Sequence, residues 1–422
     1  MQRMDPKQGP SRSRTPADPH RKVSTTMSWW PRARTDSQYL SPAKVIGGEG
    51  AAQRLPELLD RLPGYDGGAV LLAVDDAVAD AGHIDPIRAS LEQAGATVLQ
   101  RGGFGAEPTA EIVDAIAREA REAGAAAVIG VGGGSVLDSS KIIALILRHG
   151  GASADWIGPV DPTLELAPHI LIPTTVGTGS EATNIAMVTV DGAKRASMCD
   201  RYVPPVAVLD PLLVDSLPPR IIAATGLDAL AHAVEALMST KASMLSAHAS
   251  FHAMELLVAN LERAFEGDRE ALGLTMWGSH LGGQALNAGV VVGHSIAYTF
   301  AHATPMPHGV SCALALPYCI AYNQNIDERL ARRIALALTG GESGSLRDAA
   351  EAVQALARRM GLPTTLAEAR IGAEEVDGMA SYCNAEYQRP TNPEPMDEPR
   401  LRDLFAAVET GDLDRAFAVT AR

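Results

Sequence analysis

Four side chains in the second half of the chain are of the types that bind divalent metal ions. Asp228 and His232 stand four residues apart in an Ala- and Leu-rich stretch, and His294 and His308 follow, fourteen residues apart. On a helix, a spacing of four places Asp228 and His232 on one face. One carboxylate and three imidazoles suit Fe(II) or Zn(II), and such a metal polarises a substrate oxygen as a Lewis acid.

Spacing alone does not establish this prediction, because the same four-residue spacing occurs by chance elsewhere in the chain. An isolated Asp-x-x-x-His pair is more often an exposed helix face than a pair of ligands. His248 and His252 repeat the spacing without a carboxylate context, and we interpret them as ordinary helix residues. His280 and His302 have no partner that the sequence identifies. The four candidate ligands therefore need support from other motifs.

Two loops rich in glycine and hydroxyl side chains indicate a nucleotide site. The segment GVGGGS (residues 130–135) lies between an apolar strand and a helix, where helix-start amides point at a diphosphate. The alternative is a plain strand–helix turn, which needs one glycine rather than four. The second loop, residues 173–180, suits contact with a ribose, phosphate or carboxamide, the alternative being a flexible crossover. Neither loop is the GxGxxG fingerprint.

Asp75 bears on the choice of nucleotide. It follows the apolar run LLAV, where a carboxylate binds the adenosine-ribose hydroxyls in dinucleotide-binding folds. The same charge repels a 2′-phosphate, so Asp75 favours NAD over NADP. Strand ends also carry Asp by chance.

The elements that must position these residues follow from the hydrophobic pattern. From Ala43 to residue 215, short apolar runs alternate with amphipathic helical segments, which indicates βαβ units and a mainly parallel sheet. Residues 184–199 read as a hairpin that turns at Asp191-Gly192. After Pro218 the chain is helical, without a comparable strand candidate. We predict an α/β dinucleotide-binding domain over 41–215 and an all-helical metal-binding domain over 216–422, with the site in a cleft between them.

The first 40 residues differ from the rest of the chain. They are rich in Arg, Pro, Ser and Thr and nearly free of aliphatic residues, so we predict a disordered N-terminal extension over 1–40. A transit peptide is the alternative, which several prolines and the lack of an apolar stripe disfavour. We expect Met27 as a candidate start, and the intact mass of the native protein tests this.

Composition narrows the partners and the compartment. The chain has 422 residues, of which 46% are hydrophobic, and a net charge of −14, which argues against nucleic acid or anionic membrane partners. Cys199, Cys312, Cys319 and Cys383 form no CxxC pair, so neither disulfides nor a thiolate metal site is predicted, as fits a reducing cytoplasm. No uninterrupted apolar stretch is long enough to cross a bilayer, so we expect a soluble protein.

Four motifs in a fixed order carry a family resemblance: GGGSVLDSSK, PTTVGTGSEAT, GLDALAHAVE and GHSIAYTFAHATPMPHG. Together they resemble the iron-containing (group III) alcohol dehydrogenases, from about Ser41 to the C-terminus. The resemblance implies a dehydroquinate synthase-like architecture, in which an α/β N-terminal domain precedes an all-α C-terminal domain. It also implies a small aldehyde or alcohol as substrate and a homodimer, which is common in the family.

The resemblance assigns roles residue by residue. Asp228, His232, His294 and His308 match the metal ligands of the family. The matching cofactor contacts are Gly132, Gly133, Gly134, Ser135 and Asp138 in the diphosphate loop, Thr174, Thr175 and Thr178 in the second loop, and Lys194 near the nicotinamide.

One position departs from the family pattern. Many members carry a further histidine four residues after the third ligand, where this chain has Tyr298. A tyrosine there is similar to branches acting on small aldehydes with a distal anion, such as 4-hydroxybutyrate dehydrogenases, hydroxyacid-oxoacid transhydrogenases and phosphonoacetaldehyde reductases. The alternative is aromatic packing on a helix. The C-terminal segment is also similar to maleylacetate reductases, whose metal-ligand pattern differs.

The predicted activity is a metal-dependent, NAD(P)-linked oxidoreduction of a small alcohol or aldehyde, with hydride transfer to or from the nicotinamide. Tyr298, water or a ribose hydroxyl carries the proton, and the sequence does not choose among them. The main rival, a dehydroquinate synthase-like lyase, uses Glu with two His and several cations, unlike the ligand set here. A non-enzymatic metal-binding scaffold is disfavoured by the intact ligands.

Overall fold

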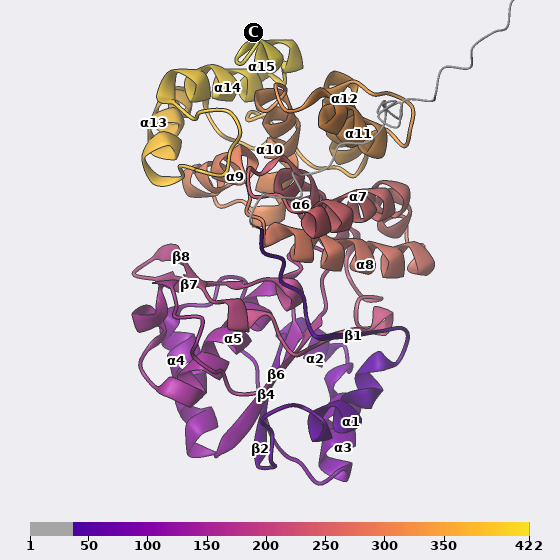
Figure 1. The fold of residues 1–422 in the computed structure, drawn as a ribbon, viewed down its shortest axis with the longest axis vertical. Coiled ribbons are helices and arrows are strands. Elements are labelled where there is room, and N and C mark those ends of the chain that lie inside the picture. Colours follow the sequence, from indigo (N-terminus) through magenta and orange to yellow (C-terminus); the bar gives the residue numbers. More distant parts are fainter. Residues whose placement is uncertain (1–36, 422) are drawn as a thin grey trace, which may run out of the picture.

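The computed structural model describes residues 37–421, and the chain forms an α/β half and a helical half (Figure 1). Most of the predicted extension, residues 1–36, lies outside the described residues. Residues 37–40 extend along the protein: the Tyr39 hydroxyl donates to Gln284 at 2.7 Å, and Gln38 donates to Asp200 at 2.7 Å. The contacts of the chain therefore begin before the predicted domain start at residue 41.

The α/β half is built on a six-stranded sheet in the order β1-β9-β6-β4-β2-β3. All of its pairings are parallel, which confirms the predicted mainly parallel sheet. Buried strands with continuous apolar runs are expected when helices cover both faces of such a sheet. The strands are β1 (Lys44–Gly47), β2 (Ala69–Val74), β3 (Thr97–Arg101), β4 (Ala125–Gly132), β6 (His169–Pro173) and β9 (Val206–Leu209).

Helices cover both faces of this sheet, as Figure 1 shows. Their bounds are α1 (Leu55–Asp60), α2 (Asp76–Asp80), α3 (Ile84–Gln93), α4 (Ala110–Glu122) and α5 (Gly134–His149). Helices α1 and α3 share one buried core with side chains such as Val70 and Ile129. Helices α4 and α5 share another with Leu71 and Val128. Alternate residues of the strands thus point into opposite cores, as the strand period of two requires.

A smaller three-stranded sheet carries the predicted hairpin. It contains β5 (Gly158–Pro159), β7 (Ile185–Val190) and β8 (Ala193–Met198) in the order β5-β8-β7. Strands β7 and β8 are antiparallel, and Val190 pairs with Ala193. Asp191 and Gly192 have φ values of 51° and 74°, which suit a two-residue turn of the type favoured in hairpins. The predicted hairpin and its turn are confirmed.

The helical half contains ten α-helices among the described residues. No strand is described after β9, which confirms the helical prediction for this half. The helices are α6 (Pro219–Met238), α7 (Met244–Phe265), α8 (Arg269–Leu286), α9 (Val292–Ala303), α10 (His308–Tyr322), α11 (Glu328–Leu338), α12 (Leu346–Arg359), α13 (Val376–Glu386), α14 (Glu398–Thr410) and α15 (Leu413–Ala418). Short 3-10 turns occur at Ala51–Arg54, Ser153–Trp156, Ser180–Ala182, Asp200–Tyr202, Pro211–Leu213 and Ala373–Glu375.

Helix α6 lies at the centre of this half and packs on α7, α8 and α10 (Figure 1). By length and composition alone it could cross a membrane, although Arg220, Asp228 and Glu235 interrupt its apolar run. Of its most apolar window, 89% is buried inside the protein. A mostly apolar helix that is buried over most of its length is expected at the core of a large domain, and α6 lies there.

The change from α/β to helical structure falls between Leu209, where β9 ends, and Pro219, where α6 begins. The halves also touch elsewhere. Gly179 has a φ of 57°, and a Cβ placed on it would lie 2.5 Å from the Cα of Gly283 in α8. Glycine is therefore required at this approach, which holds the 173–180 loop against the helical half.

Candidate active site

Three helices bring the four predicted metal ligands together. Asp228 and His232 lie on α6, His294 lies in the first turn of α9, and His308 begins α10. The Oδ1 atom of Asp228 is 3.6 Å from Nε2 of His232 and 3.8 Å from Nε2 of both His294 and His308. One carboxylate oxygen thus faces three imidazole nitrogens, as expected of ligands around one ion.

The polar atoms of this group fit a divalent metal. Asp228 Oδ1 and His232 Nδ1 are buried and have no hydrogen-bond partner among the described residues. A buried carboxylate oxygen without a partner is costly, and ligand distances of about 2.0–2.2 Å to a central ion would satisfy it. Carboxylate and imidazole donors suit iron and zinc alike. The donor atoms therefore fit the Fe(II) or Zn(II) ion that the sequence predicts.

A cysteine that sequence reasoning set aside joins the group. Cys312 Sγ lies 3.5 Å from His308 Nε2 and 3.8 Å from His294 Nε2. Single ligand atoms of Asp228, His294, His308 and Cys312 all lie within 4.8 Å of one another. Cys312 follows His308 by four residues on α10, a helical spacing that could have revealed it. The sequence predicts no thiolate site because the cysteines form no CxxC pair. That criterion does not detect a single cysteine such as Cys312.

The protonation states prepare the group for a cation. Burial by itself raises the pKa of Asp228, but the charges of His232, His308 and His294 lower that pKa to about 2. Burial lowers the pKa of His308 to about 3, and it also lowers the pKa of His232. At neutral pH the carboxylate is ionised, and these two imidazoles are neutral with lone pairs available for a metal.

Glu235 orients His294, and sequence reasoning did not single it out. Its Oε1 accepts the Nδ1 proton of His294 at 2.6 Å, and its Oε2 accepts the backbone N–H groups of Val291 and His294. Burial lowers the pKa of His294, but the charge and hydrogen bond of Glu235 outweigh it, and the pKa is raised. A carboxylate behind a metal-binding histidine fixes its tautomer and ring orientation. Its position seven residues after Asp228 on α6 was an available signal.

Tyr298 lies beside the ligands. Its ring stacks on His308 with centroids 5.1 Å apart and contacts Tyr387 at 5.4 Å. Burial raises the pKa of its phenol, which the nearby charge of Arg389 opposes. The hydroxyl makes no hydrogen bond within residues 37–421. Tyr298 therefore packs as an aromatic residue and also keeps a protonated hydroxyl near the metal ligands.

The two predicted cofactor loops meet at the carboxyl ends of neighbouring strands. Strands β4 and β6 pair in parallel, and the Thr174 N–H donates to the Gly132 carbonyl at 3.0 Å. A Cβ on Gly133 would lie 3.1 Å from the Thr175 side chain. One on Gly134 would lie 2.7 Å from that of Thr178, so side chains cannot be added there without displacing the second loop.

Helix α5 supplies the amides expected of a diphosphate site. No side chain caps its N-terminus, which begins immediately after Gly133. Unpaired amides at a helix start bind phosphate. The Ser135 hydroxyl donates to the Ala106 carbonyl, and the Asp138 carboxylate accepts from Ser180 Oγ at 2.6 Å and Met187 N at 3.0 Å. Asp138 therefore ties the second loop and β7 to α5.

Asp75 directly follows β2, the strand next to β4, and is the N-cap of α2. Its N–H donates to the Val131 carbonyl of β4, and its Oδ1 caps α2 by accepting from Ala77 N and Val78 N. Its Oδ2 makes no hydrogen bond among the residues described. The carboxylate thus has one structural oxygen and one available oxygen at the edge where the predicted ribose contact was placed.

Lys194 lies on the β7–β8 hairpin and pairs with Glu107. It follows the β7–β8 turn, and its Nζ lies 3.5 Å from Glu107 Oε1. Burial is the main cause of the lowered pKa of His308, and the charge of Lys194 contributes to it. Figure 1 shows this hairpin at the boundary between the halves, on the side of α9 and α13.

Two histidines without predicted partners have partners in the structure. His280 Nδ1 lies 2.9 Å from Glu181 Oε1 in a buried pair, and Gln284 Nε2 lies 3.1 Å from the other ring nitrogen. The His302 ring stacks on Tyr382 at 4.0 Å. His248 and His252 are exposed on α7, in agreement with their interpretation as ordinary helix residues.

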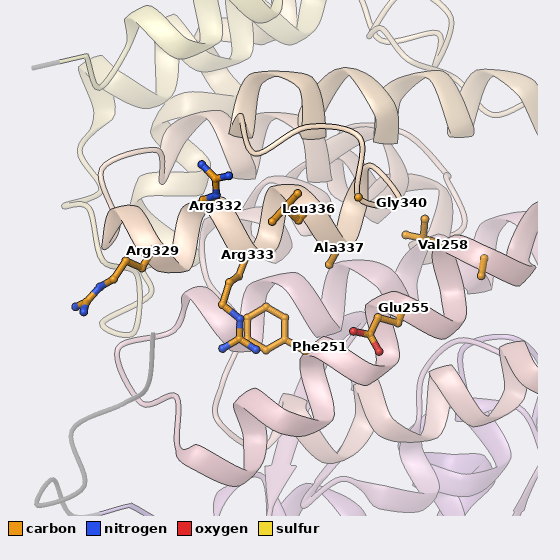
Figure 2. Close-up of a pocket in the computed structure, with 11 residues that line it drawn as sticks. Phe251, Glu255, Val258, Arg329, Arg332, Arg333, Leu336, Ala337 and Gly340 are labelled. Carbon is orange, nitrogen blue, oxygen red and sulfur yellow. The ribbon is translucent and has the colours of Figure 1, made fainter. Parts of the chain in front are cut away.

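Figure 2 shows a pocket between α7 and α11 that contains none of these residues. It is lined by Arg329, Arg332 and Arg333 of α11 and by Glu255 and apolar side chains of α7. Arg333 lies 3.8 Å over the Phe251 ring, and Arg329 pairs with Asp327 at 3.2 Å. No metal ligand or cofactor loop reaches this pocket, so we place the candidate active site at the metal-ligand group.

Comparisons with known proteins match nearly the whole of the described chain. A family described as iron-containing alcohol dehydrogenase matches residues 42–211. A second, described as the C-terminal part of the Fe-containing alcohol dehydrogenase family, matches residues 222–408. The two matches together span both predicted cofactor loops and the four predicted metal ligands.

Individual relatives agree in sequence and in fold. Long-chain-alcohol dehydrogenase 1 of Geobacillus thermodenitrificans is 34% identical over 358 residues, which cover 82% of this chain and 90% of that protein. An alcohol dehydrogenase from Oenococcus oeni superposes with a TM-score of 0.82 at 25% identity, covering 88% of this chain and all of the other. A sulfoacetaldehyde reductase from Bifidobacterium kashiwanohense, solved in complex with NAD+, gives a TM-score of 0.80 at 25% identity, covering 89% and 99%.

Proposed function

The chain belongs to the iron-containing alcohol dehydrogenase family, and from that premise we propose that it interconverts a small aldehyde and its alcohol with NAD and a divalent metal. Asp228, His232, His294 and His308 would hold the metal. The observation that carries this proposal is the buried, partnerless Oδ1 of Asp228 among three imidazole nitrogens. The family name favours iron, and zinc suits the same ligands.

The cofactor is proposed to lie along the two loops at the ends of β4 and β6. Gly132, Gly133, Gly134 and Ser135 would hold the diphosphate at the start of α5. Thr174, Thr175 and Thr178 form the facing loop, and Asp138 holds that loop in place through Ser180. Asp75 with its free oxygen supports NAD over NADP, as does the NAD+ complex of the Bifidobacterium relative.

When bound, the metal supplies Lewis-acid polarisation of the substrate oxygen and the nicotinamide supplies or accepts the hydride. The residues of the chain prepare this chemistry. Glu235 holds the Nδ1 proton of His294, so that Nε2 keeps its lone pair toward Asp228. The raised pKa of Tyr298, caused by burial, keeps its hydroxyl protonated and able to donate. Burial chiefly, and the charge of Lys194 on the hairpin in addition, lower the pKa of His308.

The substrate is proposed to be a short aldehyde that carries a distal carboxylate, sulfonate or phosphonate. Tyr298 in place of a further histidine supports this class, as does the name of the Bifidobacterium relative, sulfoacetaldehyde reductase. A maleylacetate reductase-like or a dehydroquinate synthase-like reaction has no specific observation in its favour here.

We also propose a cytoplasmic homodimer, without nucleic acid or membrane partners. The four cysteines are free and buried, which supports a reducing compartment. The net charge of −14 supports the absence of a phosphate-backbone partner.

An NADH-oxidation assay tests the proposed function. The purified protein is loaded anaerobically with Fe(II), or separately with Zn(II), and offered short aldehydes with and without a distal anion. We expect steady NADH consumption that stops on chelation and returns when metal is added. Full activity in a metal-free preparation would refute the metal assignment, and a lyase would return its NAD unchanged.

A further inference from the structure

Arg389 is an arginine without a counter-charge among residues 37–421. It lies between α13 and α14, its Nε is buried, and no hydrogen bond reaches that atom within residues 37–421. No ion pair of Arg389 is found in the same part of the chain. By contrast, Arg347 and Arg402 each pair with a carboxylate at 2.8 Å. A guanidinium that is partly removed from water without a partner is costly, which points to an anion that is not part of the protein.

The backbone around Arg389 is anchored to the start of α9, which carries His294. The Ser295 hydroxyl donates to the Tyr387 carbonyl at 2.6 Å, before Arg389. After it, the Thr391 hydroxyl donates to the Val290 carbonyl at 2.7 Å, and Val292 N donates to Asn392 Oδ1 at 3.0 Å. Hydrogen bonds on both sides therefore hold Arg389 in a fixed place beside α9.

The side chain of Arg389 lies next to the metal ligands. Its guanidinium carbon is 5.7 Å from the centroid of the Tyr298 ring, a cation–π distance. That ring in turn stacks on His308. One aromatic ring thus separates the guanidinium from a metal ligand. A cation at this position can contact the far end of a short molecule whose oxygen lies at the metal.

We propose that Arg389 is a specificity-determining residue that binds the distal anion of the substrate, a carboxylate, sulfonate or phosphonate. This inference rests on the proposed function, since it presumes that the aldehyde end lies at the metal. The planar guanidinium offers several N–H donors that suit the oxygens of such an anion. Tyr298 fills the space between the two ends of the substrate and supports the guanidinium with its face.

The test compares matched aldehydes on the metal-loaded enzyme with NADH. Succinic semialdehyde and sulfoacetaldehyde carry the anion, and pentanal and propanal serve as neutral partners. We expect Arg389→Gln to lower kcat/KM for the anionic aldehydes about 30- to 1,000-fold and to leave the neutral ones nearly unchanged. Arg389→Lys should restore part of the loss, because it keeps the charge without the planar fork. A larger fall in kcat/KM for succinic semialdehyde indicates a preference for carboxylate, and a larger fall for sulfoacetaldehyde indicates a preference for sulfonate.

Arg400→Gln is the matched control. It removes the same charge from the same region of the chain, but Arg400 already pairs with Asp397 at 3.4 Å. Its selectivity between anionic and neutral aldehydes should equal that of the unmodified protein. A similar loss in this variant would mean that overall charge, rather than Arg389, sets the preference, and would overturn the proposal.

Calorimetric binding of propane-1-sulfonate separates failure of this inference from failure of the proposed function. Binding that weakens in Arg389→Gln while no aldehyde is reduced would leave the anion site standing and reject the activity. Equal kcat/KM for anionic and neutral aldehydes in both proteins would leave the activity standing and reject the anion site. If Arg389→Gln lowers kcat/KM equally for both kinds of aldehyde, Arg389 only supports Tyr298. That outcome would also reject the anion site.

Discussion

The two halves of the molecule build their parts of the site in different ways. In the α/β half, each cofactor loop follows directly from one strand, and β4 and β6 are neighbours in the sheet. In the helical half, α6, α9 and α10 each contribute to one group of metal ligands, and Glu235 supports that group from behind. The first arrangement is local in the sequence, and the second depends on how three helices pack.

The difference has an energetic side. The glycine loop requires only small residues where Thr175 and Thr178 approach, which costs little when the cofactor is absent. The metal-ligand group buries Asp228 Oδ1 without a partner, so the helical half is expected to gain stability when an ion binds. A substitution in the helical half should therefore leave the cofactor bound, and one in the α/β half should leave the metal bound.

The largest effect is expected from Asp228→Ala. It removes the carboxylate that faces three imidazoles, so the metal should be lost and activity should fall at least about 1,000-fold, since the metal contributes several kcal/mol. Metal content by mass spectrometry and NADH oxidation measure the two losses. Cofactor binding, followed by NADH fluorescence, should persist.

His252→Ala is the control for this change. His252 has the same four-residue spacing to His248 but is exposed on α7, so metal content and rate should not change. An Asp228→Ala protein that keeps a full complement of metal would contradict the ligand assignment.

A smaller effect is expected from Glu235→Gln. The amide cannot hold the Nδ1 proton of His294 as a carboxylate does, so metal affinity at neutral pH should fall about 10- to 100-fold. The measurement is a competition titration with a chelator at several pH values.

The pH dependence of that affinity has a definite sign. The pKa of His294 is raised by Glu235 against the opposing effect of burial, and protons compete with the metal for Nε2 below that pKa. In the unmodified protein, affinity should fall as the pH falls through it. In Glu235→Gln the pKa drops, so the decline should start at a lower pH. An unchanged profile would show that Glu235 does not control His294.

Gly134→Val tests the α/β half. The added side chain meets Thr178, where even a Cβ would lie at 2.7 Å, and overpacking of this kind should weaken NADH binding about tenfold. Metal content should remain complete, in contrast to Asp228→Ala. Gly378→Ala, where a Cβ meets nothing within 4 Å, is the control and should bind NADH normally. Loss of metal in Gly134→Val would show that the halves are not independent.

The smallest effect is expected from Asp75→Asn. Asparagine keeps the cap of α2, so the melting temperature should be nearly unchanged, but the charge that opposes a 2′-phosphate is lost. The ratio of kcat/KM for NADPH over NADH should rise a few-fold. A ratio that stays constant would remove Asp75 from the cofactor site.

The sequence by itself determined the elements and the contiguous motifs. Strand and helix periods separated the two halves, Asp191-Gly192 located the hairpin turn, and the glycine loop was readable because it lies between one strand and one helix. The ordered motifs also predicted the four metal ligands. These features are set by residues that lie close together in the chain, so the sequence shows their spacing directly.

Only the tertiary structure decided which distant side chains complete the site. Glu235, Cys312 and Arg389 were not singled out, and Glu181 was not recognised as the partner of His280. Their roles arise from the packing of α6, α9, α10 and the segment after α13, which sets which faces meet and which polar atoms stay without a partner. Burial also lowers the pKa of His308 and raises that of Cys312, because the cost of removing an ion from water depends on its final surroundings rather than on its neighbours in sequence.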